Sequence, residues 1–228
     1  QKPEVLLFSF WHPFFIPAFK GIIAQVRKYS PKTKICTVAH NVSPHEGFPF
    51  ATRLMQSFFQ KNDLVITLSN QTQKEFEHLG VTTQSLTLFH PVYQRPLSSI
   101  PKDELKAKYG IKKTEKIPLF FGLIRDYKGL DVMIHALNTL DLQAHQVRPF
   151  IVGEFYTDKD KLLQLIKPEH KEQYVIIDRF VTREEANEIF TISDALILPY
   201  KSASQSGVFN DALNFHLPAI VSDQPGLT

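Results

Sequence analysis

The sequence contains little that would mark a secreted or membrane-embedded protein. A single cysteine, Cys36, stands among 228 residues, so no disulfide can form within the chain. No apolar run approaches the roughly 18 residues that a membrane-spanning helix needs, and the first residues show no charged leader followed by a long apolar block. Because one cysteine fits a reducing compartment, we expect a cytoplasmic location.

Long basic runs are absent as well. The 26 lysines and arginines are balanced by 23 aspartates and glutamates, which leaves a net charge of only +3. A protein that binds nucleic acid mainly through its phosphates needs a concentrated basic surface, so we expect no nucleic-acid partner. With 43% hydrophobic and 21% charged residues, the composition is that of an ordinary globular protein with a real core.

Phenylalanine is unusually frequent. Nineteen are present, and many crowd the first third of the chain in the stretches FSFWHPFFIPAF and GFPFATRLMQSFF. Two interpretations stay open. These side chains either pack in the core and its loops, or form an amphipathic surface that lies on a membrane or holds a lipid-linked substrate.

Short β-rich runs alternate with helical patterns from end to end, which is typical of an α/β fold with a parallel sheet. Strands are predicted at 5–8, 35–39, 64–68, 85–88, 117–121, 150–152, 175–177, 195–198 and 219–221. Helices are predicted near 17–29, 50–61, 70–79, 102–109, 130–140, 158–167, 182–192 and 207–216. Thr182 and Glu185 have the spacing of a capping box and mark one helix start clearly.

The least regular connection lies at 90–104, which holds three prolines and two serines. We therefore predict a first α/β unit at 1–93, a linker at 94–104 and a second α/β unit at 105–228. Both units look incomplete, since a buried-type strand follows Gln1 almost at once and Thr228 comes soon after another. We therefore expect that this chain is a fragment of a longer protein, cut inside both domains.

One junction between a strand and a helix carries two cations. After the strand that ends near Phe121, Gly122 permits a tight turn, Arg125 and Lys128 follow, and an apolar stripe over 130–137 predicts a packed helix. Ligands of open α/β sheets sit beyond the carboxyl ends of the strands, where this loop would lie. The pair is therefore either an anion site, with a diphosphate as the expected ligand, or two solvated surface cations.

A second junction has a polar loop, SQSG at 204–207, between a strand and a helix. Backbone N–H groups at a helix start, together with the positive end of the helix dipole, favour a bound anion. A serine in this position can equally serve only as an N-cap. Two such loops on neighbouring strand ends favour a shared anion site.

These motifs, in this order, resemble a known family. FFGLIRDYKGLD, VGEF, SDALILPY, SQSG and LPAIVS are similar to the second domain of the retaining nucleotide-sugar glycosyltransferases that have two Rossmann-like domains, the GT-B architecture. WHPFFIPAF and AHNVSPHE resemble the first domain of the same family, in a bacterial branch associated with polysaccharide assembly. The resemblance covers nearly the whole chain.

The resemblance implies a role for each matching residue. Arg125 and Lys128 would hold the donor diphosphate and stabilise it as it leaves. His40 would approach the donor sugar from the first domain, and His45 and Glu46 would lie near the acceptor. The donor-binding positions implied by the same motifs are Gly122, Gly153, Glu154, Phe155, Gln205, Ser206, Gly207 and Asp211.

The sequence departs from the family in one respect. Many members carry two glutamates, separated by seven residues, that contact the donor sugar and the ribose. The second falls on Asp211, which could still reach a ribose hydroxyl, and the first falls on Ala203. The sugar contact is thus unassigned, with Gln205 or the backbone as alternatives.

The resemblance implies sugar transfer from a nucleotide diphosphate donor to a carbohydrate or lipid-linked glycan, with retention of configuration. The alternatives are a nucleotide-sugar epimerase of the same architecture and a catalytically silent protein that binds sugar nucleotides or glycans. No cofactor and no metal are expected, because the histidines and glutamate of HNVSPHE lack the spacing of a helical zinc motif. A location at the inner face of the cell membrane stays open.

Overall fold

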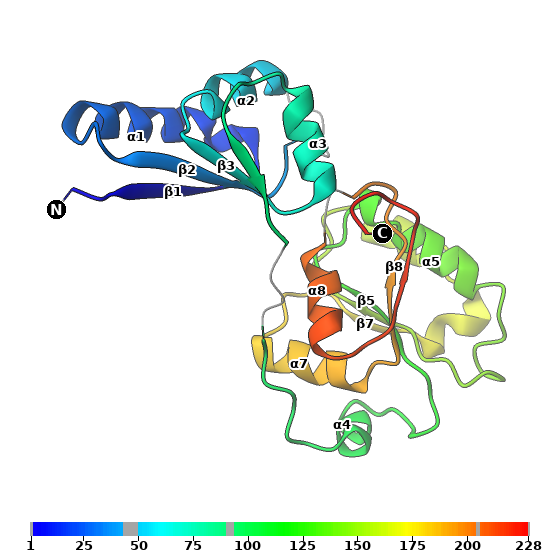
Figure 1. The fold of residues 1–228 in the computed structure, drawn as a ribbon. Coiled ribbons are helices and arrows are strands. Elements are labelled where there is room, and N and C mark those ends of the chain that lie inside the picture. The colour runs from blue at the N-terminus through cyan, green and yellow to red at the C-terminus, as the bar shows by residue number, and fades with distance from the viewer. Residues whose placement is uncertain (1, 43–49, 90–93, 204–205, 228) are drawn as a thin grey trace. The chain divides into compact units, whose positions relative to one another are not determined.

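The structure is a computed structural model that describes residues 2–42, 50–89, 94–203 and 206–227. The chain divides into two compact units, Gln1–His90 and Pro91–Thr228 (Figure 1). Both are built from parallel sheets and helices, as the alternating pattern predicts. Within the described residues, no helix combines the length and apolar character needed to cross a membrane.

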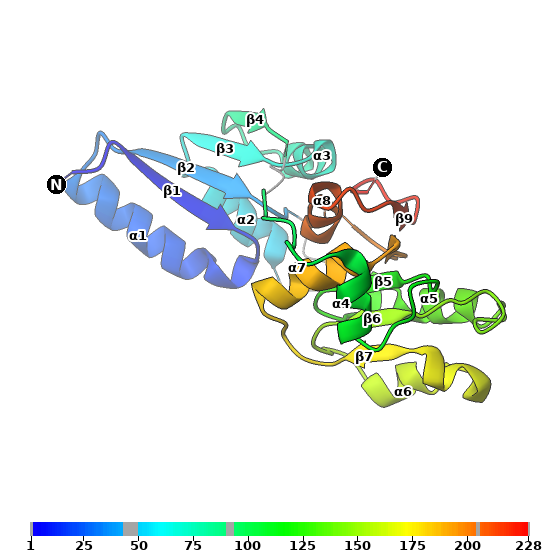
Figure 2. The same cartoon turned by 90° about the horizontal axis from the view of Figure 1, so that it is seen from below.

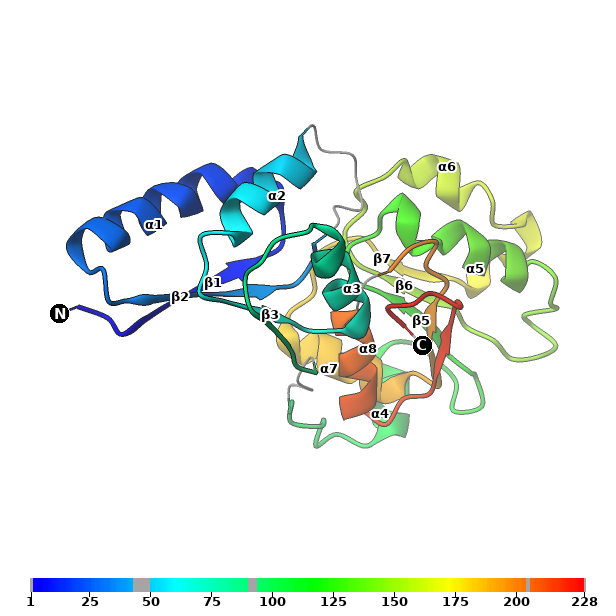
Figure 3. The ribbon, with the colours of Figure 1, turned by 45° about the horizontal axis from the view of Figure 1, so that its top comes forward.

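The first unit is a four-stranded parallel sheet in the order β1-β2-β3-β4, as Figure 2 shows. Its elements are β1 (Val5–Phe10), a 3-10 turn (Pro13–Phe15), α1 (Ile16–Tyr29), β2 (Lys34–Ala39), α2 (Ala51–Phe59), β3 (Leu64–Thr67), α3 (Asn70–His78) and β4 (Ser85–Thr87). Each crossover moves the chain in the same direction across the sheet. Because such crossovers are right-handed, their helices cover one face, and α1 and α2 lie on a common face in Figure 3.

Most phenylalanines of the first unit form its core. The rings of Phe10 and Phe58 stack at 5.4 Å between centroids, and Phe59 meets Phe76 edge-on at 5.4 Å. All four side chains are buried. The core interpretation therefore holds for them, while another set of aromatic side chains remains exposed. That set is Trp11, Phe14, Phe15, Tyr29, Phe50 and Phe89.

The second unit is a five-stranded parallel sheet in the order β7-β6-β5-β8-β9. Its elements are α4 (Lys102–Lys108), β5 (Pro118–Phe121), a 3-10 turn (Asp126–Lys128), α5 (Leu130–Leu137), β6 (Phe150–Val152), α6 (Lys159–Leu163), a 3-10 turn (Pro168–Gln173), β7 (Val175–Ile177), α7 (Arg183–Ile192), β8 (Ala195–Leu198), α8 (Gly207–Asn214) and β9 (Ala219–Val221). After β5 the chain adds β6 and β7 on one side, and then returns to add β8 and β9 on the other. The point where the strand order reverses therefore lies between β5 and β8.

Both faces of the second sheet are covered. Leu119 packs in a cluster with residues of α4, α7 and α8, while its neighbour Phe120 packs with residues of α5. Successive residues of a strand point to opposite faces, so two apolar cores follow from strands that are apolar throughout. This arrangement holds the strand ends firmly in place.

The strands form where the sequence predicts them, within a few residues at their ends. The capping box at the start of α7 is confirmed, since Thr182 accepts from the Glu185 N–H and the Glu185 carboxylate accepts from the Thr182 N–H. The helix predicted at 158–167 is too long, and α6 ends at Leu163. Pro168 disfavours helical geometry in the residue before it, so the chain leaves the helix early.

The last residues of the predicted linker are part of a helix. Helix α4 begins at Lys102, so residues 102–104 are helical and pack with the second unit. The Lys102 ammonium hydrogen bonds to the Ser193 carbonyl at 3.0 Å and pairs with Asp194 at 3.0 Å, which anchors this helix start. Arg95, earlier in the same segment, also pairs with the second unit, through Asp211.

Candidate functional site: the strand ends of the second unit

The loops that follow β5 and β8 meet at the point where the strand order reverses. The Lys201 N–H donates to the Tyr127 carbonyl at 2.7 Å and joins the two loops. Gly129 has a φ of 70°, and a Cβ there would lie 2.0 Å from the Pro199 carbonyl oxygen. Only glycine allows both this conformation and this close approach, so the loops cannot come together with another residue at 129.

The loops after β5 and β6 are equally close. Gly153 has a φ of 140°, and a Cβ there would lie 2.1 Å from the carbonyl oxygen of Gly122. A further pairing between Ile124 and Phe155 continues the contact beyond the strands. The backbones of 122 and 153 therefore form one surface at the carboxyl edge of the sheet.

Lys128 is nearly buried above this surface, with 9% of the residue exposed. Its Nζ lies 3.2 Å from where a Cβ of Gly122 would stand and 5.7 Å from the centroid of the Tyr200 ring. The ammonium makes no hydrogen bond or ion pair with any residue that the structure describes. Burial, and to a lesser extent the nearby charge of Arg125, lower the pKa of Lys128 to about 8.

The start of α8 lies beside the Lys128 ammonium. Cγ2 of Val208, in the first turn, lies 3.4 Å from the same point above Gly122. Ser206 caps the helix, since its hydroxyl accepts from the Phe209 N–H at 3.3 Å. A buried cation is repelled by the positive end of a helix dipole. A bound anion would be attracted by both and would remove this repulsion.

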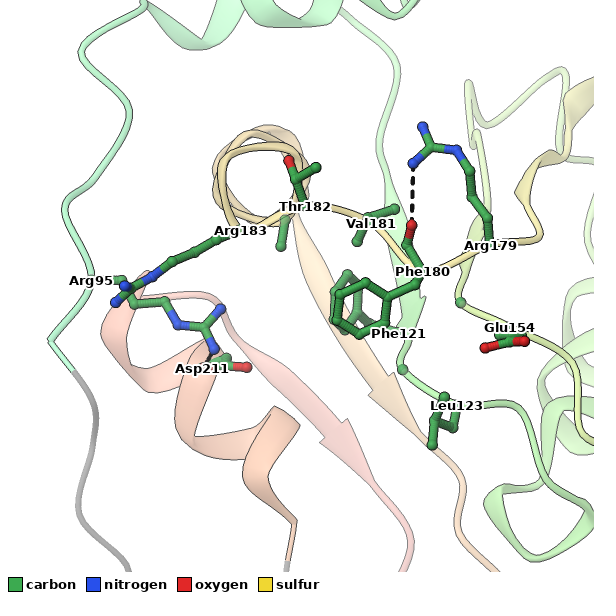
Figure 4. Close-up of a pocket in the computed structure, with 13 residues that line it drawn as sticks. Arg95, Phe121, Leu123, Glu154, Arg179, Phe180, Val181, Thr182, Arg183 and Asp211 are labelled. Atoms are coloured by element: carbon green, nitrogen blue, oxygen red, sulfur yellow. Dashed lines mark hydrogen bonds and ion pairs between the residues drawn. The ribbon is translucent and has the colours of Figure 1, made fainter.

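A pocket of about 500 Å³ opens at the same edge and is called the strand-end pocket below. Figure 4 shows the residues that line it. They are Arg95, Phe121, Gly122, Leu123, Gly153, Glu154, Arg179, Phe180, Val181, Thr182, Arg183, Ala186 and Asp211. Gly122 lines this pocket and also lies next to the Lys128 ammonium, so the cation lies at the edge of the pocket.

Four of the predicted donor-binding residues thus line one pocket. They are Gly122, Gly153, Glu154 and Asp211. Asp211 is held there by Arg95, whose Nη2 lies 3.0 Å from its Oδ1.

The sequence pattern missed the arginines and the aromatic ring of the pocket. Phe180 is 80% exposed at the rim, and Arg179 is fixed by two hydrogen bonds to Glu185, at 2.9 and 2.6 Å. These bonds and the Thr182 N–H hold the pKa of Glu185 down at about 2. The sequence could have indicated these residues, because the stretch DRF at 178–180 directly follows a predicted strand and precedes the capping box at Thr182.

Of the other predicted residues, Arg125 and Phe155 lie outside the strand-end pocket, and Ser206 and Gly207 lie at the start of α8 without lining it. The Arg125 guanidinium stands over the Tyr156 ring, 5.1 Å from its centroid, and lines a neighbouring hollow of about 680 Å³. Phe155 packs against the core around α5, and its N–H donates to Asp178. Joint binding of one diphosphate by Arg125 and Lys128 stays a prediction.

His40 belongs to the first unit. It directly follows β2, and its Nε2 lies 2.9 Å from the Ser9 hydroxyl oxygen, while its backbone N–H donates to the Phe10 carbonyl at 2.8 Å. Its predicted role toward a sugar held by the second unit stays a prediction. Three further predicted residues lie outside the described residues. They are His45, Glu46 and Gln205.

The described part of the chain contains no group of three or more histidines, cysteines, aspartates or glutamates arranged to hold a metal ion. The expectation that no metal is needed stays a prediction. The positive charges of the site come from side chains and a helix start.

Comparison with known proteins adds independent evidence on the family of this chain. A sequence family described as Glycosyl transferases group 1 matches residues 101–228. N-acetyl-alpha-D-glucosaminyl L-malate synthase of Bacillus anthracis is 23% identical over 195 residues, which are 83% of this chain and 49% of that protein. The chain thus spans about half the length of this relative.

Solved structures share the fold. Anabaena HepE in complex with UDP-glucose superposes with a TM-score of 0.75 at 15% identity, over 97% of this chain and 60% of that one. Sucrose-phosphate synthase of Thermosynechococcus elongatus superposes with a TM-score of 0.77 at 12% identity, over 97% of this chain and 56% of that one. The α/β architecture with two Rossmann-like units is therefore that of the GT-B enzymes, of which this chain spans somewhat more than half the length.

Proposed function

The chain belongs to the glycosyl transferases group 1 family, and we propose that it transfers a sugar from a nucleoside diphosphate donor to a carbohydrate or lipid-linked glycan acceptor with retention of the anomeric configuration. In this proposal the second unit binds the donor, and the first unit carries the acceptor side. The HepE structure holds UDP-glucose, which makes UDP the first nucleotide to test.

One observation carries the proposal. The Lys128 ammonium is nearly buried and makes no hydrogen bond or ion pair with any described residue, although it lies beside the first turn of α8. The Lys128 ammonium and the positive end of the α8 dipole repel each other, which lowers the stability of the fold unless an anion binds between them. The diphosphate of a nucleotide sugar supplies that anion, and the adjoining strand-end pocket of about 500 Å³ offers room for the nucleoside.

The proposed chemistry follows from this charge distribution. When the bond between the sugar and the phosphate breaks, negative charge builds on the diphosphate while the sugar becomes oxocarbenium-like. Lys128 and the start of α8 would stabilise that charge without rearranging, and Arg125 would join them from the loop after β5. His40 would act on the sugar from the first unit. The sugar contact stays unassigned, because Ala203 has no polar side chain.

The acceptor proposal rests on the first unit. Trp11 is 61% exposed, Phe14 69% and Phe50 75%. Exposed aromatic side chains of this size favour contact with an apolar or lipid-bearing partner. They support a lipid-linked glycan at a membrane surface over a small soluble sugar.

The first test is binding. We would measure the thermal unfolding of the wild type and of Arg125→Ala with UDP, GDP, dTDP and CDP. One diphosphate should stabilise the wild type, by about 2.7 kcal/mol at a hundredfold excess over its dissociation constant, and Arg125→Ala should lose most of this effect while unfolding normally without ligand. Arg183→Ala, which removes a cation from the pocket rim, is the matched control and should keep most of it.

The second test is turnover with the matching sugar nucleotide and a glycan acceptor. Removing one group that stabilises the leaving diphosphate typically costs about a hundred- to a thousandfold in rate, so Arg125→Ala should be nearly inactive. Proton NMR of the first product formed would show whether the anomeric configuration is retained. Isomerised donor without acceptor would instead identify an epimerase, and tight binding without turnover would identify a silent binding protein.

A further inference from the structure

The two residues that follow the first pair of strands lie side by side at the carboxyl edge of the first sheet. β1 and β2 are parallel neighbours, as Figure 2 shows, and Phe10 is in register with Ala39. Trp11 and His40 come next on the two strands, and their ring centroids lie 6.2 Å apart. The His40 ring is also held by Ser9, whose hydroxyl oxygen lies 2.9 Å from Nε2. The indole therefore adjoins the histidine that is proposed to act on the donor sugar.

A rigid turn keeps the indole in this place. The buried ring of Pro13 opens the 3-10 turn and restricts His12, the residue before it, to an extended conformation with φ of −152° and ψ of 138°. His12 Nδ1 also accepts from the Phe14 N–H at 3.2 Å. The backbone around Trp11 is thus fixed by the sheet on one side and by the turn on the other.

Most of the indole nevertheless faces solvent. Trp11 is 61% exposed. Tryptophan presents a broad apolar face with a single N–H at its edge, and folded proteins usually bury much of that face. A side chain whose backbone is already fixed loses little conformational entropy when a ligand covers it. Trp11 is therefore well suited to bind a flat, partly apolar ligand.

The surroundings of Trp11 favour a sugar ring over a lipid chain. A pyranose ring carries C–H groups on one face and hydroxyls around its rim. The C–H groups are slightly positive and suit the electron-rich face of an indole, while the hydroxyls need polar partners close by. Ser9, which is exposed, and His40 supply such partners at the same edge of the sheet. A lipid chain would use only the indole.

We propose that Trp11 is the platform on which the acceptor's sugar ring next to the reacting hydroxyl stacks, and that it makes the first unit selective for acceptors that end in a pyranose. This inference rests on the proposed function, because only sugar transfer makes the stacked ring an acceptor. Trp11 binds and orients that ring, and it takes no part in breaking the bond between the donor sugar and the diphosphate.

The fluorescence of Trp11 provides the assay, because it is the only tryptophan in the chain. Excited where tyrosine does not absorb, the wild type would be titrated with the methyl glycosides of glucose, galactose, mannose and N-acetylglucosamine. At least one should shift the emission to shorter wavelength in a saturable way, because the sugar replaces water on the indole. Tetraethylene glycol monooctyl ether, an alkyl chain without a sugar, should not do so below its micelle concentration. An equal response to the ether, or no response to any glycoside, overturns the inference.

Variants test whether stacking carries the binding. NMR titration of the responding glycoside would give its dissociation constant for the wild type, Trp11→Phe and Trp11→Ala. Trp11→Ala should weaken binding by roughly tenfold or more, and Trp11→Phe should lie between, because its smaller ring keeps part of the platform. Tyr29→Ala is the matched control, since Tyr29 is 63% exposed at the other end of α1 and should not matter. Unchanged binding in Trp11→Ala, or an equal loss in Tyr29→Ala, contradicts the inference. Should Trp11→Ala fail to fold, Trp11→Phe decides and must lower the affinity.

Failure of this inference can be told apart from failure of the proposed function. If a nucleoside diphosphate binds and no glycoside changes the fluorescence, Trp11 is no platform and the proposed function stands. If a glycoside binds and no nucleoside diphosphate does, the proposed function is wrong, and so is the acceptor role of the stacked sugar. When both bind, Trp11→Phe should raise the KM for the acceptor and leave the KM for the donor unchanged. Equal changes in both would refute the acceptor role.

Discussion

Replacing Lys128 by methionine should make the free protein more stable and abolish donor binding. The ammonium is nearly buried, and burial together with the charge of Arg125 lowers the pKa of Lys128 from its ordinary 10.5 to about 8. At about 1.4 kcal/mol for each pH unit, this difference corresponds to roughly 3 kcal/mol of stability lost to the buried charge. Methionine has a similar length, carries no charge and packs well against an aromatic ring such as Tyr200.

The pH dependence fixes the sign of the effect. Below about pH 8 the lysine is charged in both the folded and the unfolded chain, so its burial carries the full cost. Between about pH 8 and 10.5 the folded chain loses the proton first, and the wild type gains stability as the pH rises. The advantage of Lys128→Met should therefore be largest at pH 7 and shrink toward pH 10.

The assay is thermal unfolding at pH 7 and pH 10, with and without the diphosphate. A gain of roughly 3 kcal/mol corresponds to about 6 to 12 °C for a chain of this size. Lys106 is the matched control, since it is 3% exposed but its ammonium hydrogen bonds to the carbonyls of Lys113 and Glu115 at 3.2 and 2.6 Å. Lys106→Met should destabilise, because these two carbonyls lose their donor and the ion pair of Lys106 with Asp194 is lost. Equal losses in both variants would refute the argument.

Two further predictions follow from the same edge of the sheet. Because Lys128 loses its proton near pH 8, affinity for the diphosphate should fall by roughly tenfold between pH 7 and pH 9, as measured by calorimetry, and a flat profile in the wild type would contradict this role. Gly153→Ala should destabilise by several kcal/mol in urea unfolding and remove nucleotide binding, because its Cβ would lie 2.1 Å from the Gly122 carbonyl oxygen. Gly21→Ala, on α1 with nothing within 4 Å, should instead stabilise by about 0.5 to 1 kcal/mol.

The sequence by itself determined which segments become strands and helices, and in what order. Strands that are apolar throughout, amphipathic helices and the capping box at Thr182 are local signals, set by neighbouring residues alone. The same local signals placed Gly122 and Lys128 at a strand end, where parallel sheets bind ligands. The α/β class and much of the candidate site were therefore predictable.

Only the tertiary structure decided which strand ends become neighbours, and hence which side chains share a pocket. The reversal of strand order between β5 and β8 places Lys128 beside the start of α8, and the same packing leaves Arg125 in a separate hollow. The pairing of Arg95 with Asp211 joins residues that are far apart in the chain. A local sequence pattern does not predict such long-range partners, because packing and the pairing of buried charges determine which distant residues come into contact.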